Sequence, residues 1–421
     1  MPAERAAPPN RGFAVAFAGV LVVAAALRLI LITQMGNRFY FADTAEYETA
    51  AHSILAGHGP GPAFPRAPLY PALMAFGFWL FGEGNYAGVR MVQLLVGLSV
   101  VALTMLLGYR LGGRMVGLLA GLGAALSPTL VFTTSMLYPT ALYSALLLGV
   151  TLGARGLVVR PGGWRAVRLG GLAFLVWMTD QVALAPLAAV FGWVVMAARR
   201  AGAAWRAAFR PVVIALVAAV LLGTPWVIYH KRTYGNSAFF MQKAQIVLYF
   251  VRSDTNVAGR RTVRDTTGHF RALTTPQFVA REWGLLLQQP IEYLSDYTSE
   301  FVHFFQPMPD RIQTRNVYTT SRVRLVTALY FVPVLLLGGA GLLFGRAPLR
   351  DRVLLALVPI ATAALYSLFF TQTRYRIPTE PMMLVLAALG FVRLFPRAVA
   401  AIEDWVSPAA TNPVAPGSAA R

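Results

Sequence analysis

The chain alternates between long stretches without any charged residue and short stretches in which arginines gather. Residues 91–109 carry no charge between Arg90 and Arg110, and residues 115–154 carry none at all. A helix rises ~1.5 Å per residue and the hydrocarbon core of a bilayer is ~30 Å thick, so about 20 apolar residues suffice for one crossing. The first window predicts one membrane-spanning helix, and the second predicts a helical hairpin that turns near Pro139.

The same criterion predicts the remaining crossings and leaves one window undecided. Residues 169–198 are interrupted only by Asp180, and the window is long for one crossing and short for two. With two short crossings there, the arginine-rich short loops all face one side, as cytoplasmic loops do. The pattern therefore predicts an all-α, polytopic membrane protein of about ten transmembrane helices with partly helical outer loops and both termini in the cytoplasm. The other predicted crossings cover residues 13–33, 211–229, 325–345, 353–373 and 378–394.

Composition supports a membrane location and argues against a nucleic-acid-binding function. Of the 421 residues, 57% are hydrophobic and 13% are charged, and the mean hydropathy is +0.58. A soluble core cannot absorb so much apolar surface, whereas a bilayer can. The net charge of +20 comes from arginines between apolar runs, without a nucleic-acid-binding motif, so we expect no nucleic-acid partner. The first apolar run is too long for a cleaved signal peptide, so we count it as a crossing. With the other crossings, we expect a multi-pass protein of the cell inner (plasma) membrane.

The crossings divide the chain into a membrane body and three outer segments. In the first outer segment we expect a helix that begins at Asp43 or Thr44 and ends at Leu55, followed by an interfacial helix over 68–81. In the large outer segment a helix is predicted to start at Pro276. A later amphipathic helix there is predicted to turn three acidic residues to solvent: Glu292, Asp296 and Glu300. The predicted regions are a disordered cytoplasmic N-terminus 1–12, a transmembrane core 13–229 with the first outer loop 34–89, a large periplasmic or extracellular loop 230–323, C-terminal transmembrane helices 324–396 and a cytoplasmic tail 397–421.

Asp43 is the candidate functional residue with the strongest physical argument. It follows the first apolar run, and a carboxylate close to hydrocarbon is costly unless function requires it. The alternative is that Asp43 only caps the helix after it. Arg374 and Arg376 place two positive charges in a short outer loop, so we expect a negative partner; the alternative is that they anchor lipid headgroups. Arg28, near the outer end of the first helix, is expected to form a buried ion pair or to extend towards the headgroups.

The order of several short motifs resembles that of the GT-C membrane glycosyltransferases, and within them the branch of protein O-mannosyltransferases and bacterial lipid A aminoarabinose transferases. Asp-x-x-x-Tyr follows the first crossing, then Arg-x-Pro-Leu-Tyr-Pro, then Pro-Trp before the large outer segment, then Arg-Tyr-Arg-x-Pro before a late helix. Each motif alone has low specificity, but the ordered set covers nearly the whole chain. The matching residues are Asp43, Tyr47, Arg66, Pro68, Leu69, Tyr70, Pro71, Pro225, Trp226, Arg374, Tyr375, Arg376 and Pro378.

This resemblance implies transfer of a sugar from a polyprenyl-phosphate-linked donor to a lipid, glycan or protein acceptor on the non-cytoplasmic face. In such enzymes an aspartate of the first outer loop is the catalytic carboxylate, and Asp43 matches that position. One base suffices for an inverting displacement at the anomeric carbon, and arginine suits the charge of a leaving lipid phosphate. Besides the catalytic Asp43, the substrate-binding candidates are Tyr47, Arg66, Tyr70, Lys231, Lys243, Arg374, Tyr375 and Arg376.

The chain departs from this pattern at the outer turn between the third and fourth helices, where many members of the group carry a second acidic residue. Residues 137–140 read Leu-Tyr-Pro-Thr here, so Glu46 and Asp180 are the candidates for a second acid. Two other functions stay open: a catalytically inactive lipid-binding subunit of this fold, and a lipid or sugar transporter. The chain has no cysteine and its histidines lack ligand spacing, so we expect no metal site of those residues. An oxygen-ligated divalent cation at Asp43 stays open as a cofactor.

Overall fold

The computed structural model describes residues 11–38, 43–61, 66–234, 280, 283, 284, 286–310, 320–368 and 371–406. Every regular element in these ranges is helical, and they contain no strand. The all-α prediction is therefore confirmed for this part of the chain. The helix predicted to start at Pro276 lies outside the described residues.

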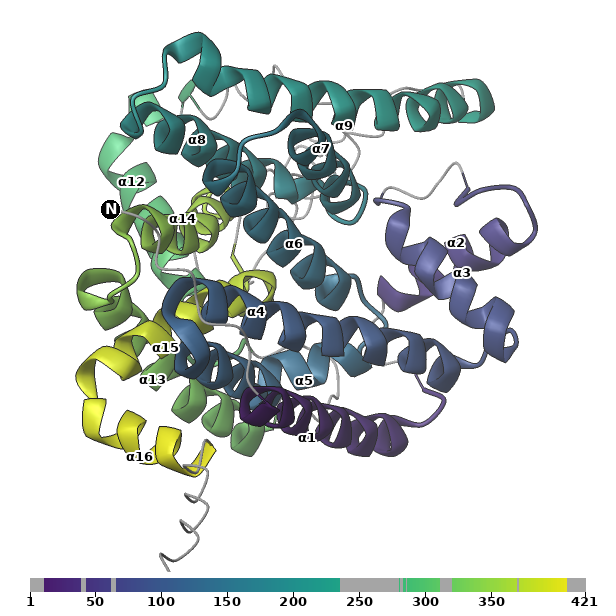
Figure 1. The fold of residues 1–421 in the computed structure, drawn as a ribbon. Coiled ribbons are helices and arrows are strands. Elements are labelled where there is room, and N and C mark those ends of the chain that lie inside the picture. Colours follow the sequence, from purple (N-terminus) through teal and green to yellow (C-terminus); the bar gives the residue numbers. More distant parts are fainter. Residues whose placement is uncertain are drawn as a thin grey trace, which may run out of the picture.

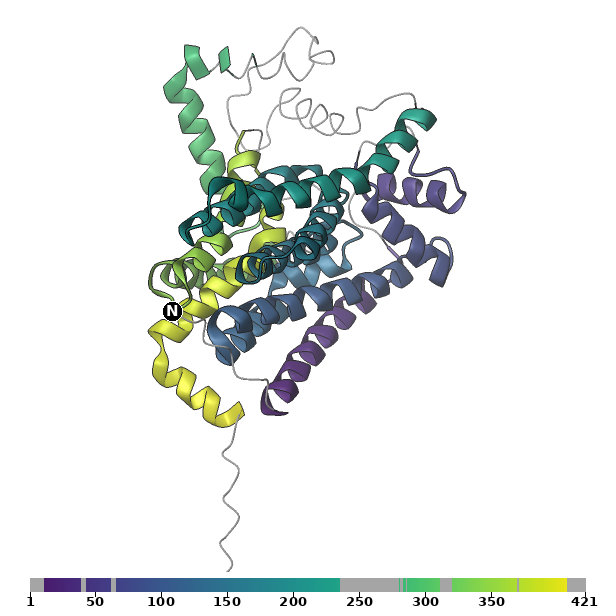
Figure 2. The same ribbon diagram turned by 45° about the horizontal axis from the view of Figure 1, so that its top comes forward.

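The helices form one bundle, with α2 and α3 grouped on one side and α16 at the opposite corner (Figure 1). After a turn of the view, α12 projects from the top of this bundle (Figure 2). In chain order the elements are α1 (Arg11–Met35), α2 (Asp43–Leu55), α3 (Leu69–Phe81), α4 (Tyr86–Leu126), α5 (Pro128–Ser135), α6 (Thr140–Val159), α7 (Gly163–Trp177), the 3₁₀ turn η1 (Gln181–Ala183), α8 (Leu184–Arg200), α9 (Trp205–Tyr234), α12 (Pro290–Phe304), α13 (Ser321–Phe344), α14 (Leu349–Tyr366), the 3₁₀ helix η4 (Thr373–Thr379), α15 (Glu380–Leu394) and α16 (Pro396–Val406).

Six helical segments of the described chain are long and apolar enough to cross a membrane, judged by length and composition. They are Gly12–Met35, Tyr86–Leu126, Thr140–Val159, Trp205–Thr233, Ser321–Phe344 and Thr373–Leu394. The chain is thus a polytopic helical protein, while the count of ten crossings stays a prediction.

Two details of the predicted order are confirmed by the helix boundaries. The window 169–198 holds two short helices, α7 and α8, separated by a turn that contains Asp180. The predicted hairpin turns at Pro139, which precedes the first residue of α6. The long helix α4 is divided at Gly113, whose φ of 82° is a conformation that favours glycine because no Cβ collides with the backbone.

Two arginines in the membrane body are buried and donate to backbone carbonyl oxygens. Arg28 donates to the carbonyl oxygens of Ala24, Ala124 and Ala125 at 3.1, 3.3 and 3.4 Å, and to the Thr134 hydroxyl at 3.2 Å. The predicted ion pair or headgroup contact of Arg28 is therefore wrong for this structure: the guanidinium joins α1 to the ends of α4 and α5. Satisfying carbonyls at helix ends in this way avoids leaving buried polar groups unpaired.

Arg90, near the start of α4, also donates to backbone carbonyl oxygens. Its guanidinium donates to the carbonyl oxygen of Ser135 at 2.6 Å and of Gly36 at 2.5 Å, and it also contacts the Arg38 carbonyl. These contacts hold the segment after α1 against the turn after α5. They fix the start of the chain segment that leads to α2.

The helices α2 and α3 form a small core of their own beside α4. Tyr47, Tyr70 and Phe78 are buried there, and they pack with Leu137 of the turn after α5. The helix α2 begins at Asp43 and α3 at Leu69, as the sequence predicted. This small core therefore fixes the first outer segment to the turn that carries residues 136–139.

The closest helix contact in the bundle joins α13 to α15 through glycines. A Cβ atom on Gly341 would lie 1.8 Å from the Leu386 carbonyl oxygen, and one on Gly390 would lie 2.0 Å from the Leu337 carbonyl oxygen. Small residues let the backbones of membrane helices approach closely enough for van der Waals contact. This contact fixes α15, which follows the predicted Arg-Tyr-Arg motif.

We expect Gly341→Ala to lower the thermal unfolding temperature of the purified protein, because the added methyl group forces α13 and α15 apart at a cost of about 1–3 kcal/mol. Gly339→Ala is the matched control: it lies on the same helix, and a Cβ there meets no atom within 4 Å. Alanine favours a helix more than glycine does, so the control should be neutral or slightly stabilised. Equal melting temperatures for the two variants would contradict the close contact.

Candidate functional site

Asp43 lies at the start of α2 and faces the turn after α5. Its Oδ2 accepts a hydrogen bond from the Tyr138 hydroxyl at 3.3 Å and lies 3.4 Å from Nη1 of Arg66. The Asp43 side chain is 32% exposed. A carboxylate that is held in place but still reached by solvent is suited to take a proton from a bound hydroxyl group.

Arg66 joins the side chains of the first outer segment. Besides Asp43, it contacts Glu46 Oε2 through Nε at 2.8 Å and the Tyr47 hydroxyl through Nη1 at 3.4 Å. Burial by itself lowers the pKa of Arg66, but the neighbouring Tyr47, Tyr138 and two carboxylates outweigh it and raise that pKa above its ordinary value. Arg66 therefore stays charged and orients both acidic side chains of α2.

Tyr138 connects this segment to the late part of the chain. Its hydroxyl donates to Asp43, and the guanidinium carbon of Arg374 lies 5.7 Å from the centre of its ring. Burial raises the pKa of the Tyr138 hydroxyl, with Asp43 and Asp180 adding to the effect and Arg374 and Arg66 opposing it. The tyrosine is therefore neutral near pH 7 and remains a hydrogen-bond donor to the carboxylate.

Asp180 belongs to the same neighbourhood. It lies in the turn between α7 and α8, where its Oδ1 accepts from the backbone N–H of Val182 at 3.1 Å. Its negative charge also acts on Tyr47, whose pKa burial raises well above the ordinary value. Of the two acids considered in the sequence, Asp180 thus acts on both Tyr47 and Tyr138, and Glu46 is joined to Asp43 through Arg66.

Arg374 is held by aromatic rings and retains a donor for a ligand. Its guanidinium carbon lies 5.4 Å from the ring centre of Tyr375, in addition to its contact with Tyr138. Tyr375 in turn stacks on Tyr366 of α14, with ring centroids 4.2 Å apart. The Nε of Arg374 is buried and has no hydrogen-bond partner among the described residues. A buried donor of this kind is costly unless a ligand or water satisfies it.

The segment that carries Arg374 is anchored to α12 and the loop after it. The Thr371 N–H donates to Glu300 Oε2 at 2.8 Å, and the Thr373 N–H donates to Asp310 Oδ2 at 2.7 Å. His303 lies 2.9 Å from the other oxygen of Asp310. The prediction that Glu300 faces solvent is therefore wrong, because its carboxylate anchors the outer loop.

Arg376 has a different environment from Arg374, although only two residues separate them. It is fully buried, its Nε lies 3.1 Å from Glu380 Oε1, and its Nη1 donates to the Gln306 carbonyl oxygen at 2.7 Å. Glu380 also accepts from the Thr129 hydroxyl. The negative partner expected for the two arginines is found for Arg376, and the pair with Glu380 makes Arg376 part of the framework, whereas Arg374 contacts the rings of Tyr138 and Tyr375.

The remaining candidates lie behind the site, at its edge or outside the described part. Tyr70 is buried, packs edge-on against Tyr47 with ring centroids 5.1 Å apart, and donates to Gln93 Oε1 at 2.5 Å. Lys231 is exposed near the end of α9, a region held to the first outer segment by the Tyr229 hydroxyl, which donates to the carbonyl oxygen of His58 at 3.1 Å. Lys243 is not among the described residues.

Arg374 lines a small cavity at this end of the bundle, together with Thr129, Pro309, Asp310, Gln372, Thr373, Arg376 and Ile377. Neighbouring charges and hydrogen bonds from His303 and Thr373 outweigh burial and lower the pKa of Asp310 below its ordinary value. No group of three or more His, Asp or Glu side chains within the described ranges is arranged to hold a metal ion. The positive charges near Asp43 come from arginines.

Two residues of this arrangement were not identified in the sequence. The sequence marks Tyr138 only as part of an outer turn that lacks an acid, and it gives Glu380 no motif. The signal for Tyr138 was its position in the outer turn opposite Asp43. The signal for Glu380 was its spacing four residues after Arg376, which places the two on one helix face.

Comparison with known proteins supports the fold at low sequence identity. No family model and no curated protein sequence matches the chain. Among solved structures, ArnT from Cupriavidus metallidurans bound to undecaprenyl phosphate superposes with a TM-score of 0.59 at 16% identity, over 95% of this chain and 65% of that one. The oligosaccharyltransferase of Archaeoglobus fulgidus in the apo form superposes with a TM-score of 0.54 at 14% identity, over 93% of this chain and 52% of that one.

These similarities show that the chain shares its fold with ArnT and with the archaeal oligosaccharyltransferase, which agrees with the resemblance of the ordered motifs. The chain spans about two thirds of the length of ArnT and about half of the archaeal enzyme.

The different roles of Arg376 and Arg374 can be tested by measuring the free energy of unfolding of their variants. We expect Arg376→Met and Glu380→Met each to lower the free energy of unfolding in detergent by about 3–5 kcal/mol, because each leaves an unpaired buried charge. The double variant should lose less than either single one, since it removes both charges. Arg374→Met should have a smaller effect. Additive losses in the double variant would show that the two charges do not stabilise each other.

Proposed function

We propose that the protein is an inverting glycosyltransferase that moves a sugar from a polyprenyl-phosphate donor to an acceptor on the non-cytoplasmic face of the membrane. The observation that supports this most directly is the convergence on Tyr138. Asp43, from the first outer segment, accepts a hydrogen bond from its hydroxyl, and Arg374, some 330 positions later, lies against its ring. A base and a phosphate-binding cation thus adjoin one tyrosine.

In the proposed reaction Asp43 takes the proton from the acceptor hydroxyl as the oxygen attacks the anomeric carbon. The bond between that carbon and the phosphate oxygen breaks, and the lipid phosphate leaves from the opposite face of the sugar, which inverts the configuration. Arg374 stabilises the charge that develops on this phosphate. Arg66 and Tyr138 hold the carboxylate in place through their contacts with Oδ2.

The similarity to ArnT bound to undecaprenyl phosphate supports a polyprenyl-linked donor. Tyr375 stacks on Tyr366 beside Arg374, and both tyrosines belong to a buried apolar cluster at the end of α14. The sugar and the acceptor are left open by these residues. A divalent cation is not required by this proposal, because Arg66 and Arg374 supply positive charge.

The proposal includes a topology of ten crossings with both termini in the cytoplasm. The six long segments account for part of this count, and the division of α4 at Gly113 yields two helices from one of them. With α5 continuing the second half of α4, this makes seven crossings, and the short helices α7 and α8 and the helix α14 supply the other three. In this arrangement Asp43, Tyr138, Asp180 and Arg374 all face the non-cytoplasmic side.

We expect Asp43→Asn to lower kcat by about 10²–10⁴-fold, because the amide cannot accept the proton. The assay is transfer from a radiolabelled polyprenyl-phosphate sugar by the purified protein in lipid vesicles, with a membrane extract as the source of acceptor. Glu48→Gln is the matched control, since Glu48 lies on the same helix but accepts from the Tyr86 hydroxyl at 2.5 Å. Full transfer by the Asp43 variant would rule out this residue as the base.

The same assay separates the proposal from its two alternatives. Flux of the labelled lipid across the vesicle without transfer would indicate a transporter. Binding of the donor with neither transfer nor flux would indicate an inactive lipid-binding subunit.

Substitutions of Arg374 and Tyr138 should change different kinetic parameters. Removing a hydrogen bond to a charged group costs about 1.5–3 kcal/mol, so we expect Arg374→Gln to lower kcat/KM for the donor by about 10–100-fold. Tyr138→Phe keeps the ring beside Arg374 and should lower kcat more than it changes donor binding. Donor titrations at saturating acceptor separate the two effects. Unchanged kinetics in Arg374→Gln would place the phosphate elsewhere.

A further inference from the structure

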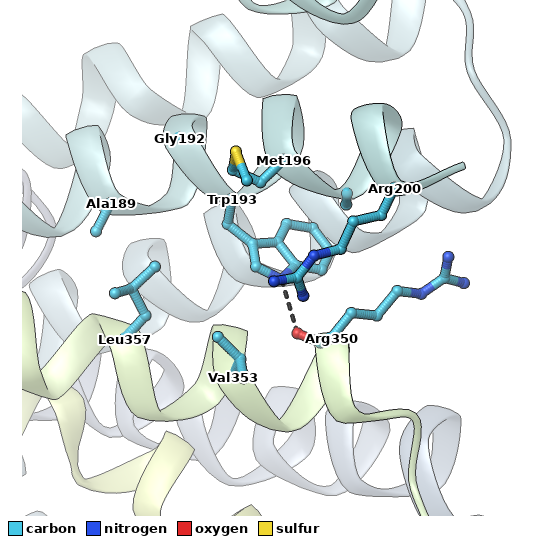
Figure 3. A pocket seen from close by; sticks show the side chains of 9 residues that line it. Ala189, Gly192, Trp193, Met196, Arg200, Arg350, Val353 and Leu357 are labelled. Atoms are coloured by element: carbon cyan, nitrogen blue, oxygen red, sulfur yellow. Dashed lines mark hydrogen bonds between the residues drawn. The ribbon is translucent and has the colours of Figure 1, made fainter. Parts of the chain in front are cut away.

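A second lined cavity lies between α8 and α14, away from the candidate active site. Its volume is about 340 Å³, and Figure 3 shows its lining, with side chains of the two helices facing each other. Most of the lining is apolar, but an arginine from each helix, Arg200 and Arg350, completes it. The lining residues are Ala189, Gly192, Trp193, Met196, Ala197, Arg200, Arg350, Val353 and Leu357.

The two arginines and the candidate active site lie at opposite ends of both helices. Arg200 is the last residue of α8, whose first residue, Leu184, follows Asp180 by one 3₁₀ turn. Arg350 lies in the first turn of α14. The last residue of α14 is Tyr366, which stacks on Tyr375. The helices have 17 and 18 residues, which correspond to about 25 and 27 Å of length. In the proposed topology of ten crossings, on which this inference rests, the arginines therefore lie near the membrane surface opposite to Asp43 and Arg374.

The charge at this end of the cavity is positive and incompletely neutralised. Arg200 is exposed and has no hydrogen bond or ion pair with any described residue. Arg350 lies 3.8 Å from Asp351, but that buried carboxylate is nearer to Arg155, at 3.2 Å. The cavity lining contains no acidic side chain. In Figure 3 the Arg200 guanidinium lies over Trp193, and the Arg350 side chain extends away from the apolar lining at the same end of the cavity. A positive end without a carboxylate suits a phosphate group that carries hydrocarbon chains.

The apolar part of the cavity has open space over α8 and a fixed indole beside it. Gly192 is exposed, and a Cβ atom there would meet no atom within 4 Å, so open space lies over this part of α8. Trp193 donates through Nε1 to the Arg350 carbonyl oxygen at 2.7 Å, which fixes the indole between the helices (Figure 3). Tryptophan and arginine together are typical of the membrane–water interface, where a lipid headgroup meets its chains.

We propose that this cavity binds an anionic glycerophospholipid of the leaflet opposite to the active site. Arg200 holds the phosphate, Arg350 adds positive charge at the same end, and one acyl chain lies over Gly192 towards Val353 and Leu357. The occupant is a bilayer phospholipid and not the polyprenyl donor, because Arg374 and Asp43 lie at the far ends of the same two helices. Since α8 and α14 pack against each other, a bound lipid would support the helix that follows the Asp180 turn and the helix that ends at Tyr366.

The test is native mass spectrometry of the full-length protein, titrated with phosphatidylglycerol and, separately, with phosphatidylcholine. Each charge-assisted contact is worth about a factor of ten in affinity, so we expect the double variant Arg200→Gln/Arg350→Gln to bind phosphatidylglycerol at least about tenfold more weakly. Its control is Arg206→Gln/Arg393→Gln, which removes the same charge from two exposed arginines outside the cavity. Gly192→Leu should weaken binding by filling the cavity, whereas Gly339→Leu, an exposed position on α13, should not.

Preference for phosphatidylglycerol that is lost in the cavity variants and kept in both controls supports the proposal. Equal binding of the two phospholipids would overturn it, as would an equal loss in the arginine control, which would indicate attraction by net charge alone. Competition by polyprenyl phosphate that disappears in Arg200→Gln/Arg350→Gln would also overturn it, because the cavity would then belong to the donor. Melting temperatures of all variants check that a loss of binding is not a loss of folding.

Discussion

The buried ion pair between Arg376 and Glu380 holds the segment on which the candidate site depends. A charge in a membrane protein is costly unless it is paired, and here each partner makes a further hydrogen bond, Arg376 with the Gln306 carbonyl and Glu380 with Thr129. The pair fixes the start of α15 against the loop after α12. Arg374, two residues earlier, is thereby directed towards Tyr138, which also contacts Asp43.

In the first half of the chain, backbone carbonyl oxygens accept hydrogen bonds from two buried arginines. Arg28 and Arg90 are buried, and they donate mainly to carbonyl oxygens in the last turns of α4 and α5 and just after α1. Those carbonyls lack helical partners, so one guanidinium group satisfies several of them. The turn after α5 is thus held on one side by Arg90 and on the other by α2. Its residue Tyr138 gains a defined position although the turn itself is irregular.

Much of the candidate site could be predicted because costly residues in a membrane sequence are conspicuous. Asp43, Arg66 and Arg374 stand out as charges beside apolar runs, and the structure places all three around Tyr138. Arg376 has the same signal, yet its buried pair with Glu380 gives it a framework role. Likewise Glu300 belongs to an acidic stripe by spacing, but it bonds to Thr371. A charge reveals that a partner is needed without revealing which partner it is.

The sequence by itself determined the all-helical membrane fold, the existence of two short helices around Asp180 and the start of α2 at Asp43, since these follow from local hydropathy, helix length and charge asymmetry. Only the tertiary structure decided that Tyr138 joins Asp43 to Arg374, that Arg28 pairs with carbonyls, and that α8 and α14 enclose a cavity. Such contacts join residues far apart along the chain. They depend on how helices are rotated and spaced against each other, and a pattern of hydrophobic positions leaves that choice open.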